Sequence, residues 1–255
     1  MTLYAVLHRM FKWLLIVSSL LFVYGYFTKD ILPNADYYDL SQLNEPIQTA
    51  TNTEDFSVEV NDQTYIIKPK FDYTLEGVIV SYHDADAFID ISHHDKWKDF
   101  INLRDLCVVW GDNVSTGIYK NMDFSNDSWT CWASWPDRET GRIFSMTQLS
   151  NNHILSHQDD INGRLMQSKP GDHIRLSGYL AEYSNPSNGF NRGTSTNRND
   201  TGNGACETIY LNEFEIIKQA NPTIRQIYAI SIWLLFISLM GYIVTFFKAP
   251  TMFKN

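Results

Sequence analysis

The sequence predicts a mainly β fold with a minor helical part, placed between two transmembrane helices. Two long apolar segments lie near the ends of the 255-residue chain. Between them, short runs of β-branched and aromatic residues are separated by Gly, Asn and Asp, as is typical of strands joined by turns. Only 19% of the residues are charged, against roughly 25% in a typical soluble domain.

The first apolar segment covers residues 10–27, after a short N-terminal stretch over residues 1–9. The run from Trp13 to Phe27 is uncharged, and it becomes long enough to span when the Lys12 amine reaches the headgroups. A basic start and an apolar run also fit a signal peptide. The segment Gly25-Tyr-Phe-Thr-Lys29 lacks the small residues of a cleavage site, so we expect an uncleaved anchor.

The second apolar segment covers residues 226–247. Its uncharged run from Ile227 to Phe247 is long enough to cross a hydrocarbon core of roughly 30 Å. Two spans place both ends, residues 1–9 and 248–255, on the same side of the membrane. The basic residues that flank these ends favour the cytoplasm, so the central segment is expected outside it.

The central segment begins with an expected linker over residues 28–55, which is polar and lacks periodicity. We place the β-rich domain at residues 56–217 and a juxtamembrane connection at 218–225. Asn61-Asp62 between the β-forming runs over 56–60 and 64–68 predicts a hairpin. The elements that follow are a strand over 73–82 with a bulge or coiling point at Gly77, a helix over Asp95–Leu103, a central strand over 106–110, and weaker strands over 128–135 and 143–149.

The second half of the domain gives a clearer pattern. Residues 158–168 suit a helix, and the turn Lys169-Pro-Gly-Asp172 leads into an alternating strand over 173–183. A long loop over 184–204 precedes a last strand over 205–217. A helix before the last strands suits a small OB-like barrel or a coiled β-sheet. OB folds bind oligonucleotides or sugars, but a fold alone does not fix a function.

Charge excludes one class of ligand. The chain has 20 Lys and Arg against 29 Asp and Glu, a formal net charge of −9. Proteins that bind nucleic acid need clustered cations for the phosphates. We therefore expect no nucleic-acid partner.

The three cysteines predict one disulfide. Cys107 and Cys131 lie on consecutive predicted strands and could pair across them in a compartment that permits disulfides. Cys206 then remains as a small buried hydrophobic residue; a reactive thiol would need electropositive surroundings.

The histidines do not form a convincing metal motif. His153 and His157 would share a face if they lay on a helix, but Ile154 stands where the His-Glu-x-x-His pattern requires Glu. We expect His153 to follow a turn at Asn151-Asn152 and to bond to a loop. No metal and no cofactor is predicted.

The densest polar group comprises Arg192, Arg198, Asp200 and Glu207. Such residues, with His153, could grip a phosphate or perform acid–base hydrolysis. The alternative is a structured loop, pinned by Arg198 paired with Asp200 or Glu207, and we favour it. Loops on rigid scaffolds nevertheless carry function, so Arg192, Arg198 and Asp200 remain candidate binding residues.

The tryptophans supply a second candidate surface. Trp129, Trp132 and Trp135 are spaced by three, so they cannot all lie on one face of a strand. Some must be exposed, which suggests that Trp129 and Trp132 contact a lipid interface or a partner. Trp110 is expected in the core.

Four segments resemble a known family when taken in order: Trp110-Gly111, Ser150–Leu155, Gly171–Leu180 and Thr194–Glu207. Residues 73–217 look like a group of uncharacterised bacterial proteins with an N-terminal membrane segment. The element Arg-x-Asp-Thr-Gly-x-Gly-Ala-Cys-Glu is the most specific part. The resemblance implies a bacterial envelope protein and gives no information about its chemistry. Together with the two apolar spans and their flanking charges, it leads us to expect an inner-membrane protein with a periplasmic domain.

Two functions follow from these features. The favoured one is a membrane-anchored binding or assembly module, an accessory subunit of an envelope complex with the lipid bilayer and membrane or periplasmic proteins as partners. The alternative is an envelope-facing hydrolase that uses His153, Arg198, Asp200 and Glu207. Side chains that converge on an open cleft would favour the hydrolase.

Overall fold

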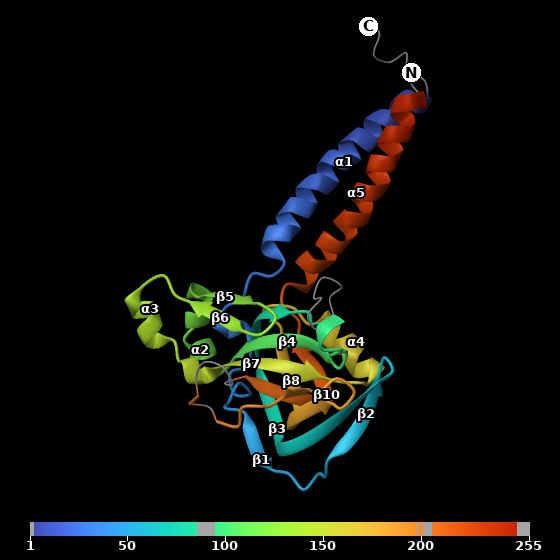
Figure 1. Ribbon diagram of the computed structural model, residues 1–255. Helices are drawn as coiled ribbons and strands as arrows, with labels where there is room; N and C mark the ends of the chain where they lie inside the picture. The colour runs from blue at the N-terminus through green and yellow to red at the C-terminus, as the bar shows by residue number, and fades with distance from the viewer. Residues whose placement is uncertain (1–2, 86–94, 198, 201–205, 249–255) are drawn as a thin grey trace. The chain divides into compact units, whose positions relative to one another are not determined.

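A computed structural model describes residues 3–85, 95–197, 199–200 and 206–248 (Figure 1). The chain divides into two compact units. The helix unit comprises Met1–Ile31 and Asn221–Asn255, and the sheet unit comprises Leu32–Ala220.

The helix unit contains two long apolar helices, α1 (Leu3–Thr28) and α5 (Pro222–Lys248). Both are long and apolar enough to cross a membrane, and each extends a few residues beyond the predicted spans. A helix of 26 residues is about 39 Å long, at about 1.5 Å per residue. The two helices lie side by side (Figure 1).

Small residues line the contact between α1 and α5. Ser18, Ser231 and Ser238 are fully buried there, and a Cβ atom on Gly25 would lie 2.8 Å from the Cβ of Tyr228. Close approach of this kind is typical of helix pairs in membranes, where packing rather than the hydrophobic effect drives association. His8, also buried, bonds through Nδ1 to Thr245 Oγ1 at 3.1 Å.

The sheet unit is built on one large sheet and a small two-stranded sheet. The strands are β1 (Ile47–Ala50), β2 (Phe56–Val60), β3 (Gln63–His83), β4 (Asn102–Val109), β5 (Asp123–Asn126), β6 (Cys131–Ser134), β7 (Leu149–Leu155), β8 (His173–Asn185), β9 (Phe190–Arg192) and β10 (Glu207–Lys218). The order in the large sheet is β1-β3-β4-β7-β10-β8-β9, and β5 pairs with β6.

The long strand β3 pairs with β4 through one part of its length and with β8 through another. Because β4 pairs with β7, β7 with β10, and β10 with β8, the five pairings form a closed circuit. All are antiparallel except the pairing of β7 with β10. This arrangement brings the segment before β4 and the segment after β8 to the same region of the unit.

The predicted hairpin is confirmed, because β2 pairs with β3 around Asn61 and Asp62. Both residues have positive φ angles, 49° and 56°, as a two-residue hairpin turn requires. The structure joins the expected strands over 64–68 and 73–82 into the single strand β3. Of the two alternatives for Gly77, the bulge is wrong: the register shifts occur at Pro69/Phe71 and Ile79/Ser81.

The main core lies between the strands of the circuit and α4 (Asp159–Gln167), whose Ile161 and Leu165 are buried against it. Trp110, predicted in the core, is fully buried. A second cluster covers the other side of β4 and includes side chains from η1 (Ala35–Tyr37), α2 (Asp112–Ser115) and η3 (Ile118–Asn121). The described part of the unit also contains the short helices α3 (Arg138–Ile143) and η4 (Met146–Gln148).

Several expectations from the sequence need correction. The expected linker over 28–55 belongs to the sheet unit from Leu32 onward, because it buries Tyr38 and Leu43 and contributes β1. The helix over Asp95–Leu103 does not form across that range. There, the Phe100 N–H donates to Tyr65 Oη at 2.9 Å, and β4 has already begun at Asn102.

The strand predicted over 143–149 is also wrong. Residues up to Ile143 end α3, and η4 precedes β7, which begins at Leu149. Asn151 and Asn152 do not start a turn but lie within β7, which is buried almost throughout. His153 is therefore a strand residue, and it does not share a helix face with His157.

Candidate functional site

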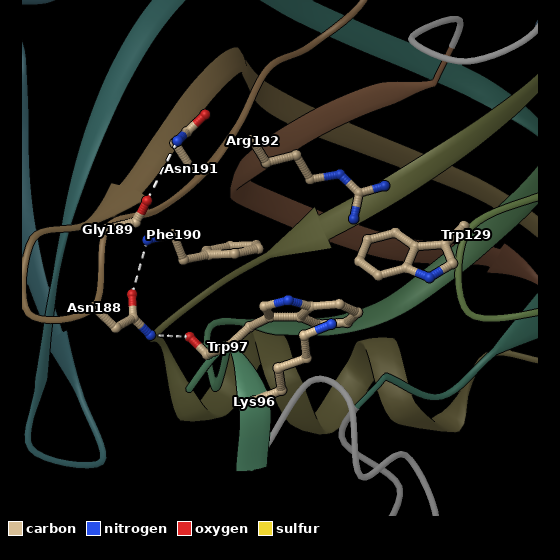
Figure 2. A pocket seen from close by; sticks show the side chains of 8 residues that line it. All are labelled: Lys96, Trp97, Trp129, Asn188, Gly189, Phe190, Asn191 and Arg192. Atoms are coloured by element: carbon tan, nitrogen blue, oxygen red, sulfur yellow. Dashed lines mark hydrogen bonds between the residues drawn. The ribbon is translucent and has the colours of Figure 1, made fainter.

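The sheet unit contains an open pocket of about 510 Å³ beside β9 (Figure 2). We call it the Trp pocket. Its walls come from the segment before β4, from the turn between β5 and β6, and from the β8–β9 hairpin. The lining residues are Lys96, Trp97, Trp129, Asn188, Gly189, Phe190, Asn191 and Arg192.

The β8–β9 turn is tied to the segment before β4 through Asn188. Its side-chain amide donates to the carbonyl oxygen of Trp97, and its Oδ1 accepts from the Phe190 N–H at 2.9 Å (Figure 2). Gly189 has a φ of 74°, a left-handed conformation that favours glycine. Two segments distant in sequence are thereby held together at the pocket.

Three aromatic rings form the apolar part of the pocket. The ring centroids of Trp97 and Trp129 are 4.8 Å apart with an interplanar angle of 71°, an edge-to-face arrangement that aromatic pairs prefer. The ring centroid of Phe190 lies 6.2 Å from that of Trp97 and 5.6 Å from that of Tyr183, which is buried in the sheet. The rings are therefore supported from the core.

Trp129 is fixed by the turn that carries it. Asp127 Oδ1 accepts from the backbone N–H groups of Trp129 and Thr130 at 2.9 and 2.8 Å, and Asn151 donates to the Trp129 carbonyl at 3.0 Å. The hydrogen bond from the Trp132 indole is the largest cause that lowers the pKa of Asp127. The turn therefore carries an ionised carboxylate at its centre.

A disulfide fastens the same turn to the sheet. Cys131, two residues after Trp129, is bonded to Cys107 on β4, and their Cα atoms are 5.7 Å apart. The bond joins the small sheet to the strand that also carries Asp105. The turn that carries Trp129 is therefore covalently linked to β4.

Arg192 forms the cationic wall of the pocket. Its guanidinium lies 4.6 Å from the centre of the Trp129 ring, within the range of a cation–π contact, and Nη2 contacts His153 Nε2. His153 on β7 lies opposite Asp105 on β4, and its Nδ1 is 2.6 Å from Asp105 Oδ1. Asp105 and His153 are both fully buried.

Hydrogen-bond chemistry fixes the form of this imidazole. A guanidinium has donors and no acceptor, so Arg192 must donate to His153 Nε2. His153 then carries its proton on Nδ1 and donates it to Asp105. A neutral imidazole thus connects the buried carboxylate to the cation at the pocket.

One buried nitrogen of the Arg192 guanidinium, Nη1, has no hydrogen-bond partner among the residues that the structure describes. An unmet buried donor costs about 1–3 kcal/mol.

The structure brings together three residues that the sequence singled out: His153, Arg192 and Trp129. Glu207 lies close by along β10, buried, next to Thr208, which is paired with His153. Trp132 is 58% exposed and donates from its indole to Asp127 at 2.8 Å. It does not line the pocket.

The remaining candidates do not line the pocket or lie outside the described residues. Asp200 is exposed and accepts a hydrogen bond from Ser195 Oγ at 2.6 Å, as expected of a carboxylate that organises its own loop. Arg198 lies outside the described residues, so the pairing expected for it stays a prediction. Cys206 accepts from Asn151 at 3.5 Å, and burial raises the pKa of its thiol, which favours the unreactive protonated form.

Sequence reasoning missed Asp105, Trp97, Phe190 and Lys96. The sequence offered one indication for Asp105: it directly precedes the apolar run Leu106–Trp110, most of which lies in β4. A carboxylate buried in a strand needs a partner. Among the described residues, no three His, Cys, Asp or Glu side chains gather as a metal site would require. Comparisons with protein-family models, with curated proteins and with solved structures give no match for this chain.

Proposed function

We propose that this chain is a membrane-anchored, extracytoplasmic binding module that holds its ligand at the Trp pocket. One observation carries the proposal. Arg192 is held against Trp129 by a buried Asp105–His153 pair, at the edge of a pocket lined by three aromatic rings. Aromatic walls with a few fixed polar groups are typical of ligand sites, and buried partners position the polar group in advance.

The fold supports this choice of site. We propose that the closed circuit β3-β4-β7-β10-β8, with α4 between β7 and β8, is an OB-like barrel. OB folds bind ligands across their second and third strands and the loops after the first and fourth strands. Lys96 and Trp97 come from the first of these loops, and Phe190 and Arg192 from the other.

The cellular location rests on two features. Two helices can cross a membrane, and disulfides persist in oxidising compartments such as the periplasm. We propose a bacterial inner-membrane protein with both ends in the cytoplasm, acting as an accessory subunit of an envelope complex. Protease added to intact spheroplasts should cut within the sheet unit, and protection of that unit would contradict this orientation.

The described residues favour binding over hydrolysis. A general acid or base must reach its substrate within hydrogen-bond distance. His153 is fully buried, with one ring nitrogen bonded to Asp105 and the other to Arg192. Asp200 bonds within its own loop. Neither side chain is presented to the pocket.

Photo-cross-linking tests the binding function. A photoreactive amino acid replaces Asn191, which is exposed at the pocket, in the full-length protein in intact cells. The matched control carries the same group at Ser57, which is exposed on β2. We expect an adduct from position 191 that is absent at position 57 and disappears with Trp129→Ala. The same labelling at both positions, or adducts that persist with Trp129→Ala, would refute the site.

A further inference from the structure

We infer that the Trp pocket takes an anionic sugar: a pyranose ring that carries a carboxylate or a phosphate. This inference rests on the proposed binding function and adds the chemical class of the ligand. Charge and ring geometry support it independently.

The charge at the pocket is opposite to that of the chain. The formal net charge of the chain is −9, yet the charged side chains that line the pocket are Lys96 and Arg192, and no carboxylate occurs among the described lining residues. Neither cation forms an ion pair with a carboxylate in the described part of the chain. Asp105 is fully buried behind the imidazole of His153. The pocket therefore presents positive charge and attracts an anion.

The position of the cations adds a geometric requirement. Lys96 Nζ lies 5.3 Å from the centre of the Trp97 ring, and the Arg192 guanidinium lies 4.6 Å from the centre of the Trp129 ring. Figure 2 shows these side chains around one space. A ligand that fits must place an apolar surface against an aromatic ring and an anionic group within a few ångströms of it.

An acidic pyranose has both parts. The negative face of an aromatic ring attracts the slightly positive C–H groups of a sugar ring. The carboxylate or phosphate of the same molecule can accept charge-assisted hydrogen bonds from the Arg192 guanidinium, which lines the pocket. A pocket of about 510 Å³ lies within the range of roughly 300–1,000 Å³ for small-molecule sites.

An acidic peptide fits less well. Extended peptides add to a free sheet edge through main-chain hydrogen bonds. The strand at the pocket, β9, has only three residues, Phe190–Arg192. A compact ring ligand uses the aromatic surface without needing such an edge.

Saturation-transfer NMR tests this inference on the full-length protein in detergent micelles. The probes are D-glucuronic acid, D-glucose 6-phosphate, neutral D-glucose and the peptide Asp-Asp-Asp-Asp. We expect saturable binding of at least one acidic sugar, with no comparable signal from glucose. Binding of glucuronic acid alone identifies a carboxylate ligand, and binding of glucose 6-phosphate alone identifies a phosphate ligand. Higher salt should weaken binding, since it screens exposed charges.

Three variants locate the binding. Arg192→Gln should raise the Kd of the acidic sugar by at least about tenfold, the effect of losing roughly 1.4 kcal/mol of binding free energy. Lys96→Gln should weaken it in the same direction, and because Lys96 is exposed this variant stays informative if Arg192→Gln fails to fold. Lys68→Gln removes the same charge from an exposed site on β3 outside the pocket and should bind like the unaltered protein.

Several results would overturn the inference. These are equal binding of glucose, binding of the tetra-aspartate peptide without the sugars, absence of binding by both acidic sugars, or equal loss in Lys68→Gln and Lys96→Gln. A Trp129-dependent adduct from position 191 without acidic sugar binding would reject this ligand class and keep the binding function. Failure of both experiments would reject both proposals.

Discussion

The disulfide between Cys107 and Cys131 should stabilise the sheet unit and hold Trp129 at the pocket. Replacing both cysteines with serine removes the bond without leaving a thiol that could pair with Cys206. The turn that carries Trp129 would then keep its hydrogen bonds to Asp127 and Asn151 but lose its covalent link to β4.

The expected cost follows from the length of the closed loop. The two cysteines are 24 residues apart in sequence. On a chain-entropy basis, closing a loop of this length contributes about 3.5 kcal/mol at 25 °C. In a unit of this size each kcal/mol lowers Tm by about 2–4 °C, so the double variant should melt about 7–14 °C lower.

Thermal unfolding of the full-length protein in micelles, followed by near-ultraviolet circular dichroism, measures this change. Cys206→Ser is the matched control, because it removes a cysteine and keeps the disulfide, and its Tm should stay the same. Titration of thiols after denaturation should find Cys206 alone in the unaltered protein and a second thiol in Cys107→Ser. An unchanged Tm in the double variant, or an unchanged thiol count in Cys107→Ser, would refute the reasoning.

Three further outcomes are expected. Burial lowers the pKa of His173 from its ordinary value of 6.5, so the unfolded chain binds the proton more tightly. The contribution of His173 to the free energy of unfolding should be fully present above pH 6.5 and be lost as the pH falls below it. The difference in Tm between pH 7.5 and pH 5.5 should therefore be smaller in His173→Gln than in the unaltered protein, and equal differences would contradict this. Since burial raises the pKa of the Cys206 thiol, iodoacetamide should modify it slowly at pH 8 in the folded protein and quickly after denaturation, and equal rates would contradict the burial. Gly178→Ala should destabilise the sheet by about 1–3 kcal/mol, because a Cβ atom there would overlap the Tyr210 carbonyl oxygen. Gly163→Ala on α4, where a Cβ meets nothing within 4 Å, should raise Tm instead, and a shared direction of change would refute the packing argument.

Local sequence rules predicted the elements whose pattern is complete within a few residues. The alternation over 173–183 predicts β8, and Asn61-Asp62 predicts the first hairpin. The terminal helices follow from uncharged length alone. In each case the information lies within the segment itself.

The strand β7 could not be predicted in this way. Its Ser150, Asn151 and Asn152 favour turns in isolation, yet all three are buried. Their polar groups are met by distant partners: Asn152, for example, donates to the Leu106 carbonyl at 3.0 Å. A single sequence does not show which distant strand supplies those partners.

In the candidate site, too, the sequence predicted residues by their own chemistry but not residues whose role depends on distant pairings. The polar and aromatic residues His153, Arg192 and Trp129 drew attention because their side chains have obvious chemistry. Asp105 and Trp97 did not, because their roles depend on pairings formed only by the fold, between β4 and β7 and between Trp97 and Asn188. The sequence therefore singled out Arg192, His153 and Trp129, but neither the buried Asp105 that bonds to His153 nor the Trp97 ring that packs on Trp129.

Native mass spectrometry of the full-length protein, extracted from its own membranes in mild detergent, tests the binding function most directly. We expect a bound component beyond the 29.5 kDa chain, which is lost in Trp129→Ala and Arg192→Gln and retained in Lys68→Gln. A bound mass that is the same in all four proteins, or no bound mass in any of them, would contradict the assignment of the Trp pocket as the ligand site.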